Sequence, residues 1–273
     1  MRLATFAAAS AAVLLAAAPA GAQTSSQTSP QAVQVFAAGS LRGVVGGLEQ
    51  AGPALGLEVK GEFGGSGSMR ERIEKGEKPD LLMSADMGSP QKLQAEGRTV
   101  LPVVAFAKNR ECVVAKTALG VTPANLTTKL LDPKVRIKTS QPVADPSGDY
   151  TWAIFDKIEA QKPGGGQTLK AKATPNMTLT APPTKPGQSA LAALFANDKI
   201  DMTIVYCSAA IDKEVPGLSS FPIPTALDPH PVYGVAVLNN RPETLRLALY
   251  LLSESGQAIV AKNGLVPLVD GAR

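Results

Sequence analysis

The sequence predicts an α/β protein, and three observations favour this fold class. Short apolar runs alternate along the chain with segments of helical periodicity. The runs at 33–38 and 81–84 are apolar almost throughout, which is typical of buried strands. About 250 residues remain after the N-terminal leader described below, which suits two domains of ordinary size. Strand–helix alternation of this kind favours sheets with helices on their faces.

The first half of the chain carries most of this alternation. Strands are expected at 33–38, 57–63, 81–84, 103–107, 112–115 and 136–139, and helices at 41–51, 68–75, 90–96, 125–131 and 150–161. Gly97 ends the third of these helices, and Pro163 with the glycine turn at 164–166 ends the fifth.

The second half has fewer strands. A helix is expected at 188–197 and strands at 202–206 and 232–238. Pro242 suits the first position of a long helix, and the closing helix ends at the glycine C-cap Gly264. The Pro- and Thr-rich stretch 174–186 is expected to be an extended surface loop.

The N-terminus has the layout of a secretory signal peptide at residues 1–22. Arg2 supplies the positive end, an apolar run follows, and Ala20-Gly21-Ala22 offers a small-residue cleavage site. A polar linker at 23–31 comes next, and no cysteine at the cleavage point supports a lipid anchor. We therefore expect an exported, periplasmic protein.

The charge is mild and dispersed. The formal net charge is +4, and it falls to +3 when Arg2 is removed with the leader. No concentrated basic stripe of the kind that binds nucleic acid is present. A small positive bias is compatible with an anionic ligand without demonstrating one.

The sequence holds two cysteines, Cys112 and Cys207. In an exported protein such a pair can form a disulfide, whereas the alternative is two small buried thiols. Their separation along the chain does not show whether they meet, so both alternatives stay open.

Catalytic motifs are scarce. His230 is the one histidine, it lies between two prolines, and it is expected in a loop. The chain has no G-x-S-x-G elbow, no H-E-x-x-H and no cysteine cluster for zinc. The run GGSGS at 64–68 lacks the Gly-Lys-Ser/Thr ending of a phosphate loop. An exported hydrolase remains an alternative only if His230 or an acid pair lies beside the serines described next.

Two serines stand where an expected strand meets an expected helix. Ser40 lies in VFAAGSLRG, and Ser66 lies in EFGGSGSMRERI, each beside glycines. Either serine could simply cap its own helix. However, ligands of open α/β sheets bind at the carboxyl ends of strands, where free backbone N–H groups and hydroxyls hold anions. The pair therefore predicts an anion site.

These segments also resemble a known family. VFAAGSL, FGGSGSMRERIEKGEKPDLLMSAD, IVYCSAA and GQAIVAKNGLVPL are similar, in this order, to the periplasmic molybdate-binding proteins of ABC importers. The resemblance covers about 33–268, and its middle part matches loosely. It implies a type II periplasmic binding protein: domain I at 32–105 and 229–273, domain II at 106–228, and a hinge between the two α/β domains.

The resemblance implies a ligand and its contacts. The family binds molybdate or tungstate through hydroxyls and backbone N–H groups, with no cofactor and no direct metal contact. Carried over, the serines are Ser40 and Ser66, the tyrosine is Tyr206, and backbone donors fall about Thr151 and Gln188. The implied partner is the membrane permease of an ABC transporter, and the implied state is a monomeric, non-enzymatic binding protein.

Three residues depart from the family pattern. Thr151 stands where alanine is frequent, Cys207 where glycine is frequent, and Asp149 lies two residues before Thr151. A carboxylate at ~4 Å would repel a dianion by about 1 kcal/mol even in water. Asp149 therefore either points away or signals another anion: sulfate, phosphate, vanadate or an organic acid. A ligand sensor without transport is a further alternative.

Overall fold

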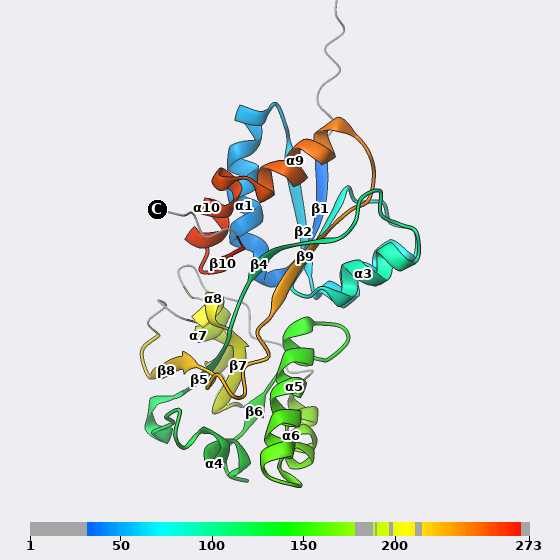
Figure 1. Ribbon diagram of the computed structural model, residues 1–273. Helices are drawn as coiled ribbons and strands as arrows, with labels where there is room; N and C mark the ends of the chain where they lie inside the picture. The colour runs from blue at the N-terminus through cyan, green and yellow to red at the C-terminus, as the bar shows by residue number, and fades with distance from the viewer. Residues whose placement is uncertain (1–31, 178–187, 189, 197–198, 211–214, 269–273) are drawn as a thin grey trace, which may run out of the picture.

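The computed structural model describes residues 32–177, 188, 190–196, 199–210 and 215–268, and these residues form two β-sheets, one above the other in Figure 1. The upper, six-stranded sheet has the order β10–β4–β9–β3–β1–β2. Its strands are β1 (Val33–Ala38), β2 (Val59–Gly64), β3 (Leu81–Ser84), β4 (Val104–Lys108), β9 (Val232–Val237) and β10 (Val266–Pro267).

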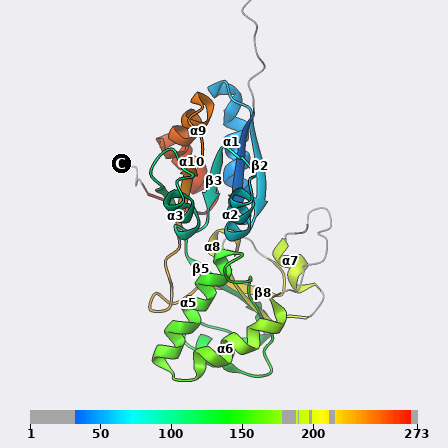
Figure 2. The same cartoon turned by 90° about the vertical axis from the view of Figure 1, so that its right-hand side faces the viewer.

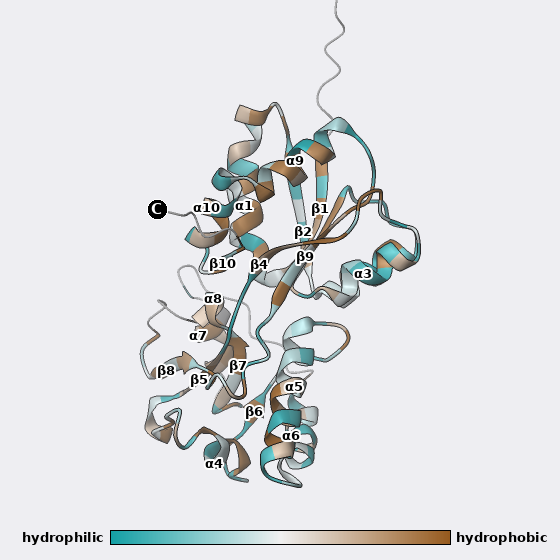
Figure 3. Cartoon of the chain, in the orientation of Figure 1, coloured by the Kyte–Doolittle hydropathy of each residue, from teal (hydrophilic) through white to brown (hydrophobic). Residues whose placement is uncertain are grey.

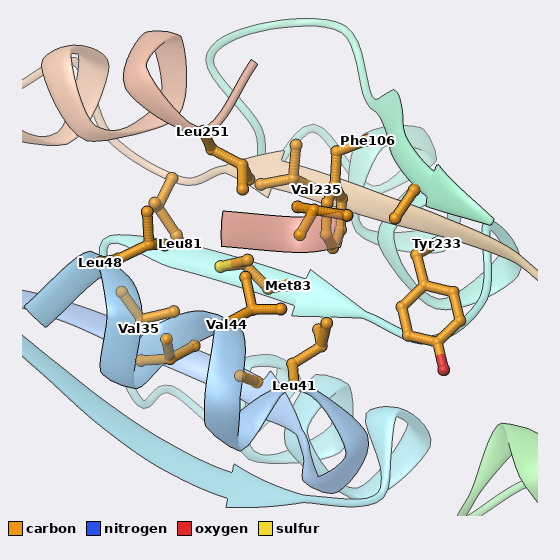
Figure 4. Packing of buried hydrophobic residues seen from close by; sticks show 14 of the residues in the cluster. Val35, Leu41, Val44, Leu48, Leu81, Met83, Phe106, Tyr233, Val235 and Leu251 are labelled. Atoms are coloured by element: carbon orange, nitrogen blue, oxygen red, sulfur yellow. The ribbon is translucent and has the colours of Figure 1, made fainter. Parts of the chain in front are cut away.

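Helices cover both faces of the upper sheet. One face carries α1 (Arg42–Ala51), α9 (Pro242–Leu252) and α10 (Glu254–Lys262), and the other carries α2 (Ser66–Glu74) and α3 (Gly88–Ala95). Neighbouring residues of β1 serve the two cores: Val35 packs with α1, whereas Phe36 packs with Met69 of α2. Figure 4 shows the first core, built by side chains from α1, β1, β3, β4, β9 and α9. Burial on both faces explains why these strands are apolar in sequence.

The lower, four-stranded sheet has the order β6–β7–β5–β8. Its strands are β5 (Glu111–Lys116), β6 (Ile137–Lys138), β7 (Met202–Tyr206) and β8 (Leu218–Pro222), and its helices are α4 (Leu126–Leu131), α5 (Pro146–Gln161), α6 (Gly165–Ala173), α7 (Ala190–Phe195) and α8 (Cys207–Ala210). The face under α5 holds the larger apolar cluster. Brown stretches of β7 and the largely teal α6 show this inside–outside contrast (Figure 3).

Two chain segments join the sheets. One is the short step from β4 to β5 through Asn109 and Arg110, and the other runs from β8 to β9. The segments are hydrogen-bonded to each other, because Asn109 N–H donates to the carbonyl oxygen of Pro231. β4 continues to Lys108, three residues past the domain limit expected at 105, and the domain limits themselves stay predictions.

The cysteine question is resolved in favour of a disulfide. Cys112 and Cys207 are bonded, with their Cα atoms 4.8 Å apart. Cys112 directly follows the first residue of β5, and Cys207 directly follows the last residue of β7. The bond therefore ties together the ends of two neighbouring strands that face the upper sheet.

Several elements differ from the sequence expectations. The helix expected at 150–161 begins at Pro146, because Asp145 caps it by accepting a hydrogen bond from Ser147 N–H and Pro146 suits the first position. The glycine turn after Pro163 leads into another helix, α6, which the glycines concealed. Strand β8 was also missed. Most of the expected loop at 174–186 lies outside the described residues.

Candidate functional site

Ser40 and Ser66 lie at the same edge of the upper sheet. β1 and β2 run parallel, with Ala38 paired to Gly64. Each serine follows its member of this pair by two residues, Ser40 within a 3-10 turn and Ser66 as the first residue of α2. The register of two parallel strands thus brings together two residues that the sequence separates. This is the edge at which open α/β sheets bind ligands.

Both serine hydroxyls are held in place. Ser66 is fully buried, and its Oγ accepts a hydrogen bond from Ala85 N–H at 3.0 Å, which leaves its own hydrogen available to donate to another acceptor. Ser40 Oγ lies 3.1 Å from the hydroxyl of Tyr233. The Tyr233 hydroxyl also accepts a bond from Asn109 Nδ2 at 3.0 Å. In Figure 4 this hydroxyl points away from the apolar core.

Tyr206 approaches this edge from the lower sheet. It is the last residue of β7, and its ring meets that of Tyr233 edge-on with centroids 5.6 Å apart. The residue is only 6% exposed, yet its hydroxyl has no hydrogen-bond partner. Burial, with Tyr233 and Glu111 nearby, raises its pKa well above the ordinary value, so it keeps its proton. A buried donor without a protein partner can be satisfied by a ligand or by water.

The turn before α5 closes onto the start of α2. Ser68 N–H donates to the carbonyl oxygen of Ala144 at 3.3 Å, and the Ser68 hydroxyl donates to the same oxygen at 3.4 Å. A Cβ on Gly65 would overlap the carbonyl oxygen of Ala144, and one on Gly67 would overlap that of Val143. The glycines of this motif therefore let the two halves of the molecule touch. Figure 2 shows α2 above α8 and α5, where the halves meet.

Asp149 has a structural task in this turn. Its Oδ1 accepts a hydrogen bond from Val143 N–H at 2.9 Å, and Val143 adopts a left-handed φ of 69° that β-branched residues avoid. Burial, then Asp86 and Asp145, raise the Asp149 pKa, while the Val143 N–H and Arg70 lower it. The carboxylate that departs from the family pattern is thus engaged in holding a turn.

Thr151 and Gln188 are the two remaining residues predicted for the site. Thr151 is fully buried one turn inside α5, and its hydroxyl donates to the carbonyl oxygen of Ser147 at 2.8 Å. Because the helix begins earlier than expected, the free N–H groups of its first turn belong to residues before Thr151. Gln188 is partly buried and stands between stretches outside the described residues. Ligand contact by either residue stays a prediction.

The nearby arginines are engaged elsewhere. The Arg42 guanidinium lies over the ring of Phe63, 4.4 Å from its centroid, and Arg70 Nε lies 3.0 Å from a carboxylate oxygen of Glu74. The donors gathered at the edge, Ser40, Ser66 and Tyr206, are therefore neutral. Neutral hydroxyls and backbone N–H groups suit an anion stripped of water.

His230 lies on the connection to β9 and takes no part in these hydrogen bonds. Its side chain is 63% exposed, and its Nδ1 lies 3.9 Å from Asp228. The hydrogen bonds found for Ser40 and Ser66 do not involve it, so a hydrolase gains no support. Within the part of the chain that the structure describes, no cluster of His, Cys, Asp and Glu could hold a metal ion. No described helix is long and apolar enough to cross a membrane.

The buried polar residues Tyr233, Glu111 and Thr139 were missed in the sequence. Glu111 opens the apolar run ECVVA, and an acid at the start of a buried strand was the available signal. Tyr233 could not be singled out, because its hydroxyl reaches Ser40 only through the pairing of β3 with β9.

Sequence comparisons identify relatives across most of the chain. The family model for bacterial extracellular solute-binding proteins matches residues 33–266. A protein of Pasteurella multocida (strain Pm70), named as uncharacterised, is 38% identical over 182 residues, which are 64% of this chain and 74% of that protein.

Solved structures share the fold at low sequence identity. A sulfate-binding protein of Mycobacterium tuberculosis has a TM-score of 0.67 and 17% identity, over 89% of this chain and 88% of that one. A periplasmic molybdate-binding protein of Azotobacter vinelandii has a TM-score of 0.64 and 19% identity, over 86% and 98%. The substrate-binding domain of a putative molybdenum ABC transporter from Clostridium difficile has a TM-score of 0.58 and 21% identity, over 87% and 99%. The fold is that of type II periplasmic binding proteins.

Proposed function

We propose that this chain, which belongs to the family of bacterial extracellular solute-binding proteins, captures a tetrahedral oxyanion in the periplasm and delivers it to the permease of an ABC importer. Molybdate or tungstate is the ligand we favour. The site is the edge formed by Ser40 and Ser66 on the upper sheet and Tyr206 on the lower one. Structures of the same fold are named for molybdate and for sulfate, so the fold suits this class of ligand.

The observation that carries the proposal is the Tyr206 hydroxyl. It is buried and unpartnered, and its ring packs on Tyr233, whose hydroxyl contacts Ser40. Leaving a buried donor unpaired costs about 1–3 kcal/mol, and an oxyanion oxygen between Tyr206 and the serines would remove this cost.

The number of donors would set the choice of anion. Molybdate and tungstate are larger than sulfate, so a smaller ion in the same space would leave some donors unpaired. Each unpaired buried donor would cost about 1–3 kcal/mol, which is about fivefold to a hundredfold in affinity. Sulfate, phosphate, vanadate and organic acids are the alternatives, and a direct comparison separates them.

Thermal unfolding with a panel of anions tests the proposal. The disulfide-intact mature protein is heated with molybdate, tungstate, sulfate, phosphate or vanadate at equal ionic strength. A ligand at 100 times its Kd should stabilise the protein by ~2.7 kcal/mol. Ser40→Ala and Ser66→Ala should each reduce this gain, whereas Ser219→Ala should not. Ser219, on β8 of the lower sheet, makes only a 3.4 Å bond to the carbonyl oxygen of Ala115 and serves as the matched control.

The outcomes separate the alternatives. A gain with sulfate or phosphate but not with molybdate or tungstate would keep the binding protein and change its ligand. If none of the anions raises the unfolding temperature, the oxyanion proposal fails. If the gain survives both serine substitutions, the ligand binds elsewhere.

A further inference from the structure

The face of the lower sheet beneath α5 turns polar at the end that meets the upper sheet. Glu111 of β5 is paired with Tyr206 of β7, and directly paired residues of antiparallel strands project to the same face. Val113 and Ile204, two positions along each strand, lie in the apolar cluster under α5, which identifies that face. Thr139 lines a small void with Phe155 and Ile204, so it belongs to the same face.

These three polar side chains share an unusual property. Glu111 is fully buried, Thr139 is 2% exposed, and Tyr206 is 6% exposed. Neither carboxyl oxygen of Glu111, nor the hydroxyl of Thr139, nor that of Tyr206 has a hydrogen-bond partner. Most buried polar atoms in folded proteins are paired, so these donors and acceptors on one face are suited to a hydrogen-bonding ligand.

The charges around Glu111 are mainly acidic. Asp228, on the connection to β9, and Asp145, the cap of α5, both interact with it electrostatically. Tyr150, Tyr206 and Tyr233, which also face it, are neutral phenols whose pKa values are raised by burial.

The cations near Asp228 and Asp145 contact groups other than Glu111. Arg110 Nε lies 3.5 Å from Asp228 Oδ2, and Lys157 Nζ donates to the carbonyl oxygen of Asp228. His230 also faces Asp228. Lys138 Nζ donates to the carbonyl oxygens of residues 176 and 177, and burial lowers its pKa.

These surroundings determine the protonation state of Glu111. An ionised carboxylate without hydrogen bonds or a counter-ion is strongly disfavoured in a buried site. Burial first, and then Asp228 and Asp145, raise the pKa of Glu111 well above its ordinary value. A neutral carboxylic acid carries an O–H group and is therefore a hydrogen-bond donor.

We propose that Glu111 is a ligand-binding residue that acts as a neutral acid and donates its O–H to an oxygen of the bound oxyanion, beside the hydroxyls of Tyr206 and Thr139. This inference rests on the proposed function and specifies its ligand class: a fully ionised oxyanion, whose oxygens only accept hydrogen bonds. The proton stays on Glu111 in the complex, because the bound negative charge favours the neutral acid. Loss of this proton to solvent at high pH would turn a donor into a repelling charge.

The test is the affinity for molybdate and for sulfate between pH 6 and pH 9.5, measured by calorimetry. Wild-type affinity should fall by up to about tenfold per pH unit above the Glu111 pKa, because one proton is then taken up on binding. Glu111→Gln keeps a neutral donor, so its affinity should not fall in this way. Glu111→Ala has no donor and should bind more weakly than Glu111→Gln at pH 7. Since the Gln variant retains Lys138, Arg110 and His230, the difference between it and wild type isolates Glu111.

Two results would overturn the inference. One is equal weakening by Gln and Ala at pH 7, which would mean that Glu111 accepts rather than donates. The other is a pH profile shared by wild type and Glu111→Gln. Should wild type bind no oxyanion at any pH, the proposed function fails and this inference fails with it. Far-ultraviolet circular dichroism of each variant checks that it folds. Thr139→Val is a second variant, which removes an unpaired hydroxyl while nearly keeping the shape of the side chain. Thr139→Val should weaken binding without changing the pH profile, and an unchanged affinity would remove Thr139 from the site.

Discussion

The upper-sheet side and the lower-sheet side of the proposed site, called here the upper and lower walls, differ in how their polar groups are hydrogen-bonded. On the upper sheet, the hydroxyls of Ser40 and Tyr233 contact each other, and Asn109 donates to the tyrosine. On the lower sheet, Glu111 and Tyr206 are buried without partners. The upper wall is therefore largely hydrogen-bonded without a ligand, whereas in the proposed complex the lower wall would gain its hydrogen bonds from the ligand. On this proposal, the favourable free energy of binding would come mainly from the lower wall.

Removing the disulfide should have the largest effect, because it destabilises the lower wall while leaving the upper wall unchanged. Cys112 and Cys207 follow Glu111 and Tyr206 directly, so their bond fixes the two strands that present the lower wall. For a separation of 95 residues, chain entropy gives a stabilisation of about 4.7 kcal/mol. We expect Cys112→Ala/Cys207→Ala to lower the free energy of unfolding by about 2–5 kcal/mol in urea.

The affinity for the ligand should also fall, because the two strands that present Glu111 and Tyr206 are no longer covalently linked. Reduction of the wild-type protein provides an independent comparison with the double variant. Unfolding curves that coincide for the oxidised, reduced and double-variant proteins would show that the bond contributes nothing.

Glu111 should make the ligand-free protein less stable as the pH rises. A carboxyl whose pKa is raised by folding loses its proton more readily when unfolded, so stability is full below the unfolded pKa of about 4.3 and falls as pH increases towards the raised value. Relative to Glu111→Gln, wild type should lose up to about 1.4 kcal/mol per pH unit in this window. Urea unfolding at pH 4, 5, 6 and 7 measures the slope, and parallel curves for the two proteins would contradict a protonated Glu111.

Gly67→Ala should disrupt the contact between α2 and the turn before α5. Its Cβ would overlap the carbonyl oxygen of Val143, so the turn before α5 could not contact α2 as it does here. We expect at least a tenfold loss of oxyanion affinity, about 1.4 kcal/mol. Gly46→Ala, inside α1, is the control, because a Cβ there meets nothing within 4 Å. Equal affinities for the two variants would show that the contact at Gly67 is unimportant for binding.

Two Tyr→Phe substitutions should have opposite effects on stability. Tyr206→Phe removes an unpaired buried hydroxyl and should leave the ligand-free protein as stable or more stable, by up to about 1 kcal/mol. Tyr233→Phe breaks the bonds to Ser40 and Asn109 and should destabilise it by about 1 kcal/mol. Thermal unfolding of both variants without ligand checks the signs. Destabilisation of similar size in both would mean that the walls are equally well paired.

Much of the upper wall could be predicted from the sequence. Ser40 and Ser66 stand in glycine-flanked segments where an apolar strand meets a helix, and this local pattern decides their place. The apolar character of β1 and β3 follows from burial on both faces. Tyr206 was predicted only from the resemblance to a family, because a single tyrosine at a strand end has no local sequence signature.

The lower wall depends on long-range register, so the meeting of Glu111 with Tyr206 could not be predicted. Glu111 meets Tyr206 only because β5 pairs with β7, whose sequence lies about ninety residues further on. Thr151 was placed wrongly relative to its helix, since the cap at Asp145 moves the helix start back to Pro146. The role of Asp149 was hidden for a related reason: its partner is the N–H of Val143, exposed by a left-handed turn that nothing in the local sequence demands.

The left-handed Val143 has a consequence for release. A non-glycine residue in this conformation raises the free energy of the form in which the turn contacts α2 by about 1–2 kcal/mol, and β-branching makes the conformation harder to hold. If the domains separate to release a ligand, this turn would be free to relax. A protein that delivers its ligand to a transporter must release it as well as bind it. A difference of about 1.4 kcal/mol corresponds to about tenfold in the equilibrium constant for binding. We expect this turn to shorten the residence time of the ligand, so that unloading at the membrane competes with retention.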